Sequence, residues 1–308
     1  MTDDRFSRQS FLGDDSQEII ERAIIGIAGL GGGGSHIAQQ LAHVGFLRYR
    51  IYDGDITEDS NLNRLIGAKE DDPSKKTPKI EIAERIIKGL RAKAIVESYP
   101  CRWQDQPEPL RGCDLIFGCV DGFSERRELE ACARRYVVPL IDIGMDVHCV
   151  GDEPPRMAGQ IILSMPGSPC MFCLDFLNER VLAREGERYG DAGPRPQVVW
   201  PNGVLASTAV GIAVDLLTDW TRSLRDVVYL EYDGNKNTVK PHLRLNYLRD
   251  RACPHYPADQ VGDPSFTNAI DQKRNEPSLE GRELWGKSTP NTSWWMTNGE
   301  GQVMAATA

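Results

Sequence analysis

Residues 23–34 read AIIGIAGLGGGG, an apolar run that ends in a cluster of glycines. The apolar part has the length of one buried strand of a parallel sheet. Apolar residues then recur at helical spacing up to about Val44, and a second short run, residues 49–52, ends at Asp53. Strand, glycine turn, helix and strand in this order predict a βαβ unit, which begins a parallel sheet.

The same stretch predicts a nucleotide-binding loop. Gly29, Gly31 and Gly34 fit the pattern G-x-G-x-x-G, with Gly32 inside it. Glycines let the backbone approach a phosphate, and the helix N-terminus supplies N–H groups and a partial positive charge. Asp53, at the end of the next strand, would accept hydrogen bonds from ribose hydroxyls. The pattern does not distinguish ATP from NAD, and a tight glycine turn without a ligand is the structural alternative.

Alternating patterns continue along the chain and predict an α/β fold. Further strands are expected at residues 94–98, 114–120 and 137–143, with helices at residues 77–90 (Thr77 as the cap, Pro78 first) and 123–136. In the second half we expect adjacent strands at 147–150 and 160–164, a mobile crossing loop at 184–201, a buried helix at 203–220, and a hairpin of 227–232 with 239–245. The prediction is a doubly wound, Rossmann-like, mostly parallel sheet continued by antiparallel strands.

This pattern also predicts the domain organisation. Residues 1–257 are expected to form one domain, with one half at about 20–145 that contains the glycine loop and a second half at about 146–257. Residues 258–308 lose periodicity and form a polar C-terminal extension.

Charge and composition exclude some classes of function. The 308 residues carry a formal net charge of −9, which argues against a general nucleic-acid binder because such a protein needs a basic face. No uninterrupted apolar stretch of membrane-spanning length occurs, and the polar, acidic N-terminus is unlike a signal peptide. We therefore expect a cytoplasmic protein that binds no membrane, whose 8 cysteines form no disulfide framework.

Further motifs follow the glycine loop in a fixed order. RFSRQ stands at residues 5–9, DGD at 53–55, SNLNR at 60–64, TPK at 77–79 and CVD at 119–121. In this order they resemble the ThiF/MoeB/HesA family, relatives of the adenylation domain of ubiquitin-activating enzymes. The resemblance runs from about Arg5 to His255. It implies that residues 1–257 are an adenylation domain, in which about 20–145 are the nucleotide-binding half and about 146–257 the partner-binding half. It implies an adenylyltransferase that uses ATP and Mg²⁺ on the C-terminal glycine of a ubiquitin-like, β-grasp protein.

The resemblance also implies roles for individual residues. Asp53 would hold the ribose with Asp55 beside it in the nucleotide site, Asn61 and Arg64 would contact the phosphates, and Lys79 would neutralise the triphosphate.

Two more roles concern the far end of the triphosphate. Asp121 would hold Mg²⁺ near the leaving pyrophosphate. Because family members are homodimers or pseudo-dimers, Arg8 would reach the γ-phosphate of a neighbouring subunit's ATP. Taken alone, Arg64 or Lys79 is a solvated surface charge, Asp121 a helix cap and Asn61 a turn residue.

The chemistry of adenylation requires these residue types independently. A carboxylate must approach an α-phosphate, and two like charges at about 4 Å repel by ~4 kcal/mol at an effective dielectric near 20. Arginine, lysine and magnesium offset this repulsion most where charge develops in the transition state. No nucleophilic side chain and no base are needed, because the substrate is already ionised.

Cysteines at the end of the resemblance suggest a metal site. Cys170 and Cys173 form a C-x-x-C, and Cys253-Pro-His255-Tyr256 stands where the resemblance implies a second C-x-x-C, with four thiolates on a structural zinc. Tyr256 occupies the fourth position, so His255 would complete a Cys₃His set. An emptied site and a redox pair of Cys170 and Cys173 are the alternatives.

The expected crossing loop, residues 184–201, contains no cysteine. Some relatives use a cysteine there to form a thioester, so this chain is expected to stop at the acyl-adenylate. Four alternatives remain: adenylation of a short peptide or small-molecule carboxylate, an NAD-dependent oxidoreductase, an inactive partner subunit, and dehydration chemistry on a tRNA base. An oxidoreductase would leave Arg64, Lys79 and Asp121 without a role.

Overall fold

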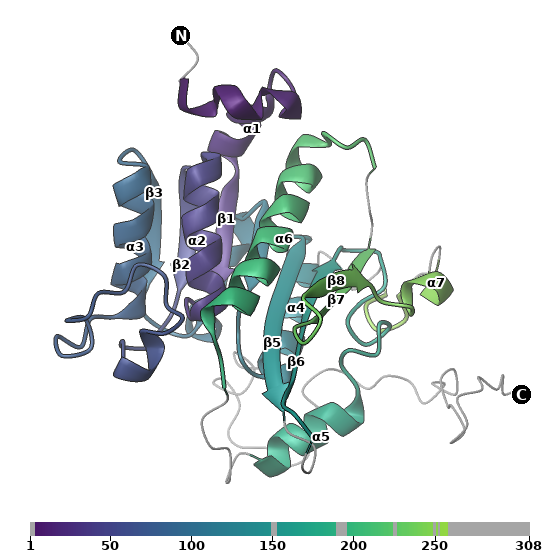
Figure 1. Ribbon diagram of the computed structural model, residues 1–308. Helices are drawn as coiled ribbons and strands as arrows, with labels where there is room; N and C mark the ends of the chain where they lie inside the picture. Colours follow the sequence, from purple (N-terminus) through teal and green to yellow (C-terminus); the bar gives the residue numbers. More distant parts are fainter. Residues whose placement is uncertain are drawn as a thin grey trace, which may run out of the picture. The chain divides into compact units, whose positions relative to one another are not determined.

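A mixed eight-stranded sheet organises the chain (Figure 1). This computed structural model describes residues 4–148, 153–188, 196–223, 227–248, 251 and 253–257. The strand order is β3-β2-β1-β4-β5-β6-β7-β8. The strands are β1 Ile24–Ala28, β2 Arg48–Tyr52, β3 Ile95–Tyr99, β4 Leu115–Gly118, β5 Leu140–His148, β6 Arg156–Ser164, β7 Val227–Asp233 and β8 Thr238–Pro241. The predicted α/β fold class is confirmed.

The sheet changes character at β5. From β3 to β5 all neighbours are parallel, whereas β5, β6, β7 and β8 pair antiparallel. Parallel neighbours need crossover connections, and helices supply them between β1 and β2 and between β4 and β5. The antiparallel neighbours β7 and β8 join by a short hairpin, whereas the connection from β6 to β7 carries α5 and α6. The sequence predicted this division.

Helices cover both faces of the sheet. Figure 1 shows α2, α3 and α6 across one face and α4 behind the other. The helices are α1 Ser16–Arg22, α2 Gly32–Val44, α3 Lys79–Leu90, α4 Phe123–Arg135, α5 Glu179–Arg188, α6 Val199–Thr218 and α7 Leu245–Leu248, and the 3-10 helices are η1 Asp4–Leu12, η2 Asp59–Asn61, η3 Trp103–Asp105 and η4 Glu108–Gly112. One apolar core joins α1, α2, α3 and α6 to the sheet, and a second joins α4 and residues 170–177 to its other face.

Two glycines let the first strand, helix α2 and the β4 loop approach closely. Gly29 has a φ of +88°, and a Cβ there would lie 2.6 Å from the carbonyl oxygen of Cys119. A Cβ on Gly34 would lie 2.0 Å from the carbonyl oxygen of Gly29. Both positions therefore require glycine, because a side chain would push the helix or the β4 loop away.

Several predicted boundaries were wrong. Residues 147–148 continue β5 rather than starting a new strand, because they pair with residues 156–157 of β6. Helix α5 covers part of the expected crossing loop, and α6 begins at Val199 rather than at residue 203. Strand β8 ends at Pro241, and residues 245–248 form α7 instead. Pro78, not Thr77, is the N-cap residue of α3.

Helix α6 is the one described helix that is long and apolar enough to cross a membrane by length and composition. In this fold its side chains Leu205, Ala206, Ala209 and Ala213 are buried in the core against α2 and the sheet. The composition therefore matches a core helix that covers a sheet face. The predicted extension, residues 258–308, lies outside the described residues, so the domain boundary at residue 257 stays a prediction.

Candidate functional site

A cavity of about 270 Å³ opens at the carboxyl ends of the parallel strands. In open α/β sheets, ligands bind at this edge, where the strand order reverses. The loops after β1, β2, β3 and β4 and the outer part of β5 contribute its walls. The predicted residues that line it are Gly29, Gly31, Gly32, Asp53, Asp55, Asn61, Arg64, Lys79 and Asp121. Residues far apart in the sequence thus meet around one space.

The glycine loop forms one wall of the cavity and starts α2. Gly31 is the N-cap residue of α2, no side chain caps it, and nothing lies within 4 Å of where its Cβ would be. A Cβ on Gly32 would lie 2.5 Å from Nδ2 of Asn202. Asn202 therefore packs against Gly32, whereas the space beside Gly31 is open to an anion, as phosphate binding requires. Gly34, also predicted as a nucleotide contact, does not line the cavity but packs α2 against β1.

Asp53 is held in place by backbone groups. The N–H of Leu30 donates to Oδ2 at 2.7 Å, and the N–H of Asp55 donates to Oδ1 at 2.8 Å. Burial raises the pKa of Asp53, while Lys79 and these two N–H groups act against that shift. Each carboxylate oxygen keeps lone pairs for further donors. The carboxylate is thus pre-positioned for two hydroxyl donors such as those of a ribose.

Lys79 reaches the cavity from the first residue of α3. Its Nζ donates to Oδ2 of Asp55 at 2.7 Å, and its backbone N–H donates to the carbonyl of Asp55 at 3.0 Å. The Lys79 side chain is 13% exposed, whereas that of Asp55 is 71% exposed. A bound polyanion would compete with this exposed carboxylate for the ammonium group, because phosphate oxygens are strong acceptors for lysine.

Asn61 and Arg64 stand on the turn around η2. The buried Asn61 accepts the N–H of Glu58 on its Oδ1 at 3.0 Å, so this amide shapes the turn as well as lining the cavity. The Arg64 guanidinium donates to the carbonyl of Ser60 at 2.5 Å and to Oδ1 of Asn63 at 3.1 Å. These bonds hold the Arg64 guanidinium beside the start of α2 and leave some of its donors for a ligand.

Asp121 lies just after β4, on the opposite wall. Its Oδ1 accepts the Nε2 of Gln197 at 3.4 Å. The carbonyl of Gln197 in turn accepts Nδ2 of Asn63 at 3.0 Å. Asp121 is exposed and its carboxylate is a hard oxygen ligand, which fits Mg²⁺ shared with phosphates. The residues before α6 thus link both sides of the cavity.

The sequence interpretation gave no role to several lining residues. These are Arg102, Glu125, Arg126, Gln197 and Asn202. Burial raises the pKa of Glu125, whereas Arg102 and hydrogen bonds from Gln104 and Trp103 act against that shift.

Arg126 is the most informative of these omissions. It donates to Asp142 and to the carbonyl of Val120, and at 3.0 Å to the carbonyl of Ile143. It therefore ties the β4 loop that carries Asp121 to β5. Its helical spacing to Leu129 and Ala133 was the available signal, since all three share the buried side of α4.

The charged sequence of residues 123–136 predicts a polar-faced helix, and in α4 several of these charged side chains are buried. Arg126, Glu130 and Arg134 are 6%, 0% and 1% exposed. Their partners lie on β5 and β6 and in the loops after β4 and β6. The polar side chains are buried because each finds an opposite charge or a carbonyl inside.

Arg8 lies on η1, is exposed and does not line the cavity. Its predicted target is the γ-phosphate in a neighbouring subunit. That role stays a prediction.

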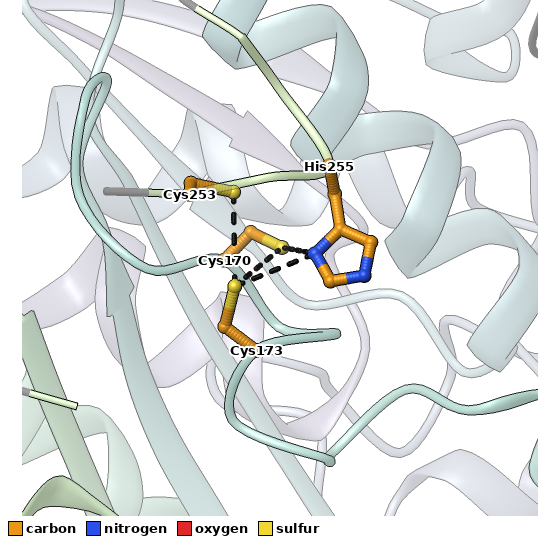
Figure 2. A group of neighbouring side chains, drawn as sticks. All are labelled: Cys170, Cys173, Cys253 and His255. Carbon is orange, nitrogen blue, oxygen red and sulfur yellow. Dashed lines mark hydrogen bonds between the residues drawn. The ribbon is translucent and has the colours of Figure 1, made fainter. Parts of the chain in front are cut away.

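A second candidate site lies away from the cavity, among Cys170, Cys173, Cys253 and His255 (Figure 2). The Sγ atoms of Cys170 and Cys173 are 3.8 Å apart, as are those of Cys173 and Cys253. Nδ1 of His255 lies 3.4 Å from the Sγ atoms of both Cys170 and Cys173. All four ligand atoms lie within 4.8 Å of one another.

These distances fit a tetrahedral metal. Zinc–sulfur bonds of about 2.3 Å and zinc–nitrogen bonds of about 2.0 Å place tetrahedral ligand atoms roughly 3.5 to 3.8 Å apart. The structure therefore brings together the four residues that the sequence suggested. Nδ1 of the otherwise exposed His255 faces the thiols, and its ring stacks on Phe172 with centroids 5.3 Å apart. The short C-x-H spacing is thus compatible with a shared site.

A buried network holds the loop that carries Cys170. The N–H of Met171 donates to Oε1 of Glu130 at 2.9 Å, and Arg134 donates to the carbonyls of Ser168 and Pro169 at 2.8 and 3.1 Å. Tyr256, at the position of the missing cysteine, has its ring under the Arg134 guanidinium at 5.1 Å. The network fixes this loop from the side opposite to solvent.

Solved structures share the fold. Escherichia coli MccB, in a crystal structure with ATP, superposes with a TM-score of 0.61 at 18% identity, over 78% of this chain and 72% of that chain. At this level of identity the likeness establishes the fold alone.

Curated relatives and a family model show which protein family the chain belongs to. The sulfur carrier protein ThiS adenylyltransferase of Bacillus subtilis (strain 168) is 30% identical over 260 residues, which cover 81% of this chain and 70% of that protein. SAMP-activating enzyme E1 of Haloferax volcanii is 29% identical over 176 residues, 56% of this chain and 61% of that protein. This chain spans 48% to 61% of the length of several such relatives. The ThiF family model matches residues 5–255, so the chain belongs to the ThiF family.

Proposed function

We propose that this protein is an adenylyltransferase that uses ATP to activate the C-terminal carboxylate of a ubiquitin-like protein. The supporting observation is the convergence of the open α2 N-terminus, Asp53, Arg64, Lys79 and Asp121 on one cavity. Relatives that share the family are named as adenylyltransferases for sulfur carrier proteins.

The residues would divide the work along the nucleotide. Asp53 binds the ribose, and the glycine loop binds phosphates at the start of α2. Arg64 and Lys79 lie where they offset the repulsion between an incoming carboxylate and the α-phosphate. Mg²⁺ on Asp121, when bound, would neutralise charge on the leaving pyrophosphate. The cations matter most as charge develops, so their loss should lower the rate more than it weakens nucleotide binding.

The reaction would end at an acyl-adenylate. The carboxylate oxygen attacks the α-phosphorus, a new P–O bond forms, and the bond to the pyrophosphate oxygen breaks. No cysteine stands in residues 184–201, where a thioester-forming residue would be expected. Transfer would then be to a sulfur donor, an amine or another protein, which must attack the activated carbonyl.

Three finer proposals accompany the activity. The active protein is a homodimer, in which Arg8 of one subunit reaches the triphosphate in its neighbour. The Cys170, Cys173, Cys253 and His255 cluster holds a structural zinc, supported by its tetrahedral spacing. The protein acts in the cytoplasm, where its thiols stay reduced.

Pyrophosphate exchange tests the activity directly. Labelled pyrophosphate should enter ATP only when Mg²⁺ and an acceptable carboxylate partner are both present. The partners to compare are a β-grasp protein ending in glycine, the same protein lacking that glycine, and a short peptide with the same C-terminal sequence. If the short peptide supports exchange and the β-grasp protein does not, the substrate is a peptide rather than a ubiquitin-like protein. Absence of exchange with all partners, together with quenching of NADH fluorescence on mixing, would favour an oxidoreductase.

A further inference from the structure

Glu185 of α5 caps the first turn of a different helix, α4. Its Oε1 accepts the N–H of Phe123 at 2.7 Å, and its Oε2 accepts the N–H of Ser124 at 2.7 Å. Residue 185 is 62 positions from Phe123 in the sequence. A carboxylate on two N–H groups at a helix start makes charge-assisted bonds and complements the helix dipole. Glu185 therefore joins α5 to the first turn of α4 through two charge-assisted hydrogen bonds.

The turn that Glu185 holds at the start of α4 also carries Asp121. Gly122, the residue after Asp121, is the N-cap of α4 and has no side chain to cap it. A Cβ on Gly122 would lie 3.1 Å from Oε1 of Glu185, so the carboxylate lies against this residue. The position of the Asp121 backbone thus depends on a group from the connection between β6 and α6.

The other end of this connection touches the same place. Gln197, just before α6, donates to Asp121 and accepts from Asn63. Arg126 supports the turn from behind through the carbonyl of Val120. Of these supports only Glu185 combines a full charge with two backbone bonds at the helix start. It is the contact whose loss should most loosen the turn.

We propose that Glu185 is a positioning residue that fixes the Asp121 turn and so sets the Mg²⁺ affinity of the MgATP site. This inference rests on the proposed function, because it assigns Mg²⁺ to Asp121. Groups that orient a metal ligand without touching the metal commonly change metal affinity by about 10- to 100-fold. The connection that carries Glu185 thereby becomes part of the metal site without contributing a ligand.

Two variants separate position from charge. Glu185→Gln removes the charge and can accept only one of the two N–H groups. Glu185→Asp keeps the charge but shortens the reach to the helix. Glu179→Gln, an exposed position on the same helix, is the matched control for net charge. Calorimetric titration with ATP at graded MgCl₂ concentrations reports binding without turnover, and thermal melting reports the fold.

In both Glu185 variants the Mg²⁺ concentration for half-maximal enhancement of ATP binding should rise roughly tenfold. Binding of ATP without Mg²⁺ should match that of the unaltered protein, and Glu179→Gln should change neither quantity. Normal Mg²⁺ dependence in Glu185→Asp, or in both variants, would overturn the positioning role. If the unaltered protein itself binds no ATP at any Mg²⁺ concentration, the proposed function fails instead.

Discussion

The nucleotide cavity and the cysteine–histidine cluster place their polar groups in opposite ways. In the cavity, Asp121 and Asp55 are exposed and Lys79 is held by one exposed carboxylate. In the cluster, Cys170 and Cys173 are buried, and Glu130 and Arg134 bind the backbone of their loop from inside. Exposed charges can exchange partners with a passing ligand at small cost. Buried ones are costly to separate, so they suit a permanent structure.

The two sites should therefore differ in their effects on activity and on stability. The cavity stands on loops after parallel strands, which can change without disturbing the two cores. The cluster joins residues that are 80 to 85 positions apart in the sequence, and its four ligand atoms lie within 4.8 Å of one another. We expect changes in the cavity to lower activity with little effect on stability, and changes in the cluster to do the reverse.

The largest effect is expected for Lys79→Ala and Asp121→Ala. Each removes charge stabilisation from the proposed transition state, so pyrophosphate exchange should fall by about 10³-fold or more. The Lys79–Asp55 pair is largely exposed on one side, so its loss should cost at most about 1 kcal/mol of stability. Exchange assays with calorimetric melting measure both. Exchange at normal rates in both variants would remove the assigned roles.

A cluster substitution should have the reverse profile. Cys173→Ser should abolish stoichiometric zinc and lower the melting temperature by roughly 10 °C, because metal binding contributes folding free energy. Cys113→Ser changes a buried cysteine outside the cluster and controls for the polarity of serine. Elemental analysis and melting with and without a chelator provide the measurements. Zinc-free protein with an unchanged melting curve would mean that the cluster is not a structural metal site.

The smallest effect is a pH dependence behind the cavity wall. Burial raises the pKa of Asp142 to about 6, only partly offset by Arg126. The folded protein then binds this proton more tightly than the unfolded chain, whose Asp has a pKa of about 3.9. This group's contribution to stability should fall by about 2–3 kcal/mol as pH rises from about 4 to about 6. Urea unfolding across this range measures it, and Asp142→Asn should remove that component.

Asp72 provides a control of opposite sign. Arg85 lowers its pKa to about 2, chiefly through a hydrogen bond, so its contribution is present above about pH 4 and is lost as pH falls toward 2. Asp72→Asn should therefore leave the slope between pH 4 and 6 largely intact. An Asp142→Asn profile parallel to that of the unaltered protein would contradict the assignment.

Local sequence patterns were enough to predict the nucleotide half of the fold. A buried strand, a tight glycine turn and an acidic residue at the end of the next strand each have a local sequence signature. Their spacing was therefore enough to locate the strand before Gly29, the glycine loop and Asp53. Parallel strands also bring their carboxyl ends to one edge. Motifs after successive strands, such as those at Asp53 and Asp121, therefore had to converge.

Interactions between distant segments could not be predicted in the same way. Helix α4 has a polar sequence, and the burial of Arg126, Glu130 and Arg134 depends on hydrogen bonds and opposite charges from β5, β6 and the loops after β4 and β6. Asp142 within an apolar strand was a second local hint, beside the helical spacing of Arg126 to Leu129 and Ala133. The cluster was suggested by resemblance, but its tetrahedral spacing depends on how Cys253 and His255 return to the loop of Cys170.

The close approach of Gly29 to the Cys119 carbonyl has a consequence for how this fold can diversify. Main chain meets main chain there, so at this point of the cavity the loop after β1 packs against the loop after β4 without an intervening side chain. Substitutions of other lining residues should leave this backbone contact in place. Proteins with this fold can therefore change the side chains that recognise the acceptor while the backbone contact beside the nucleotide site stays the same.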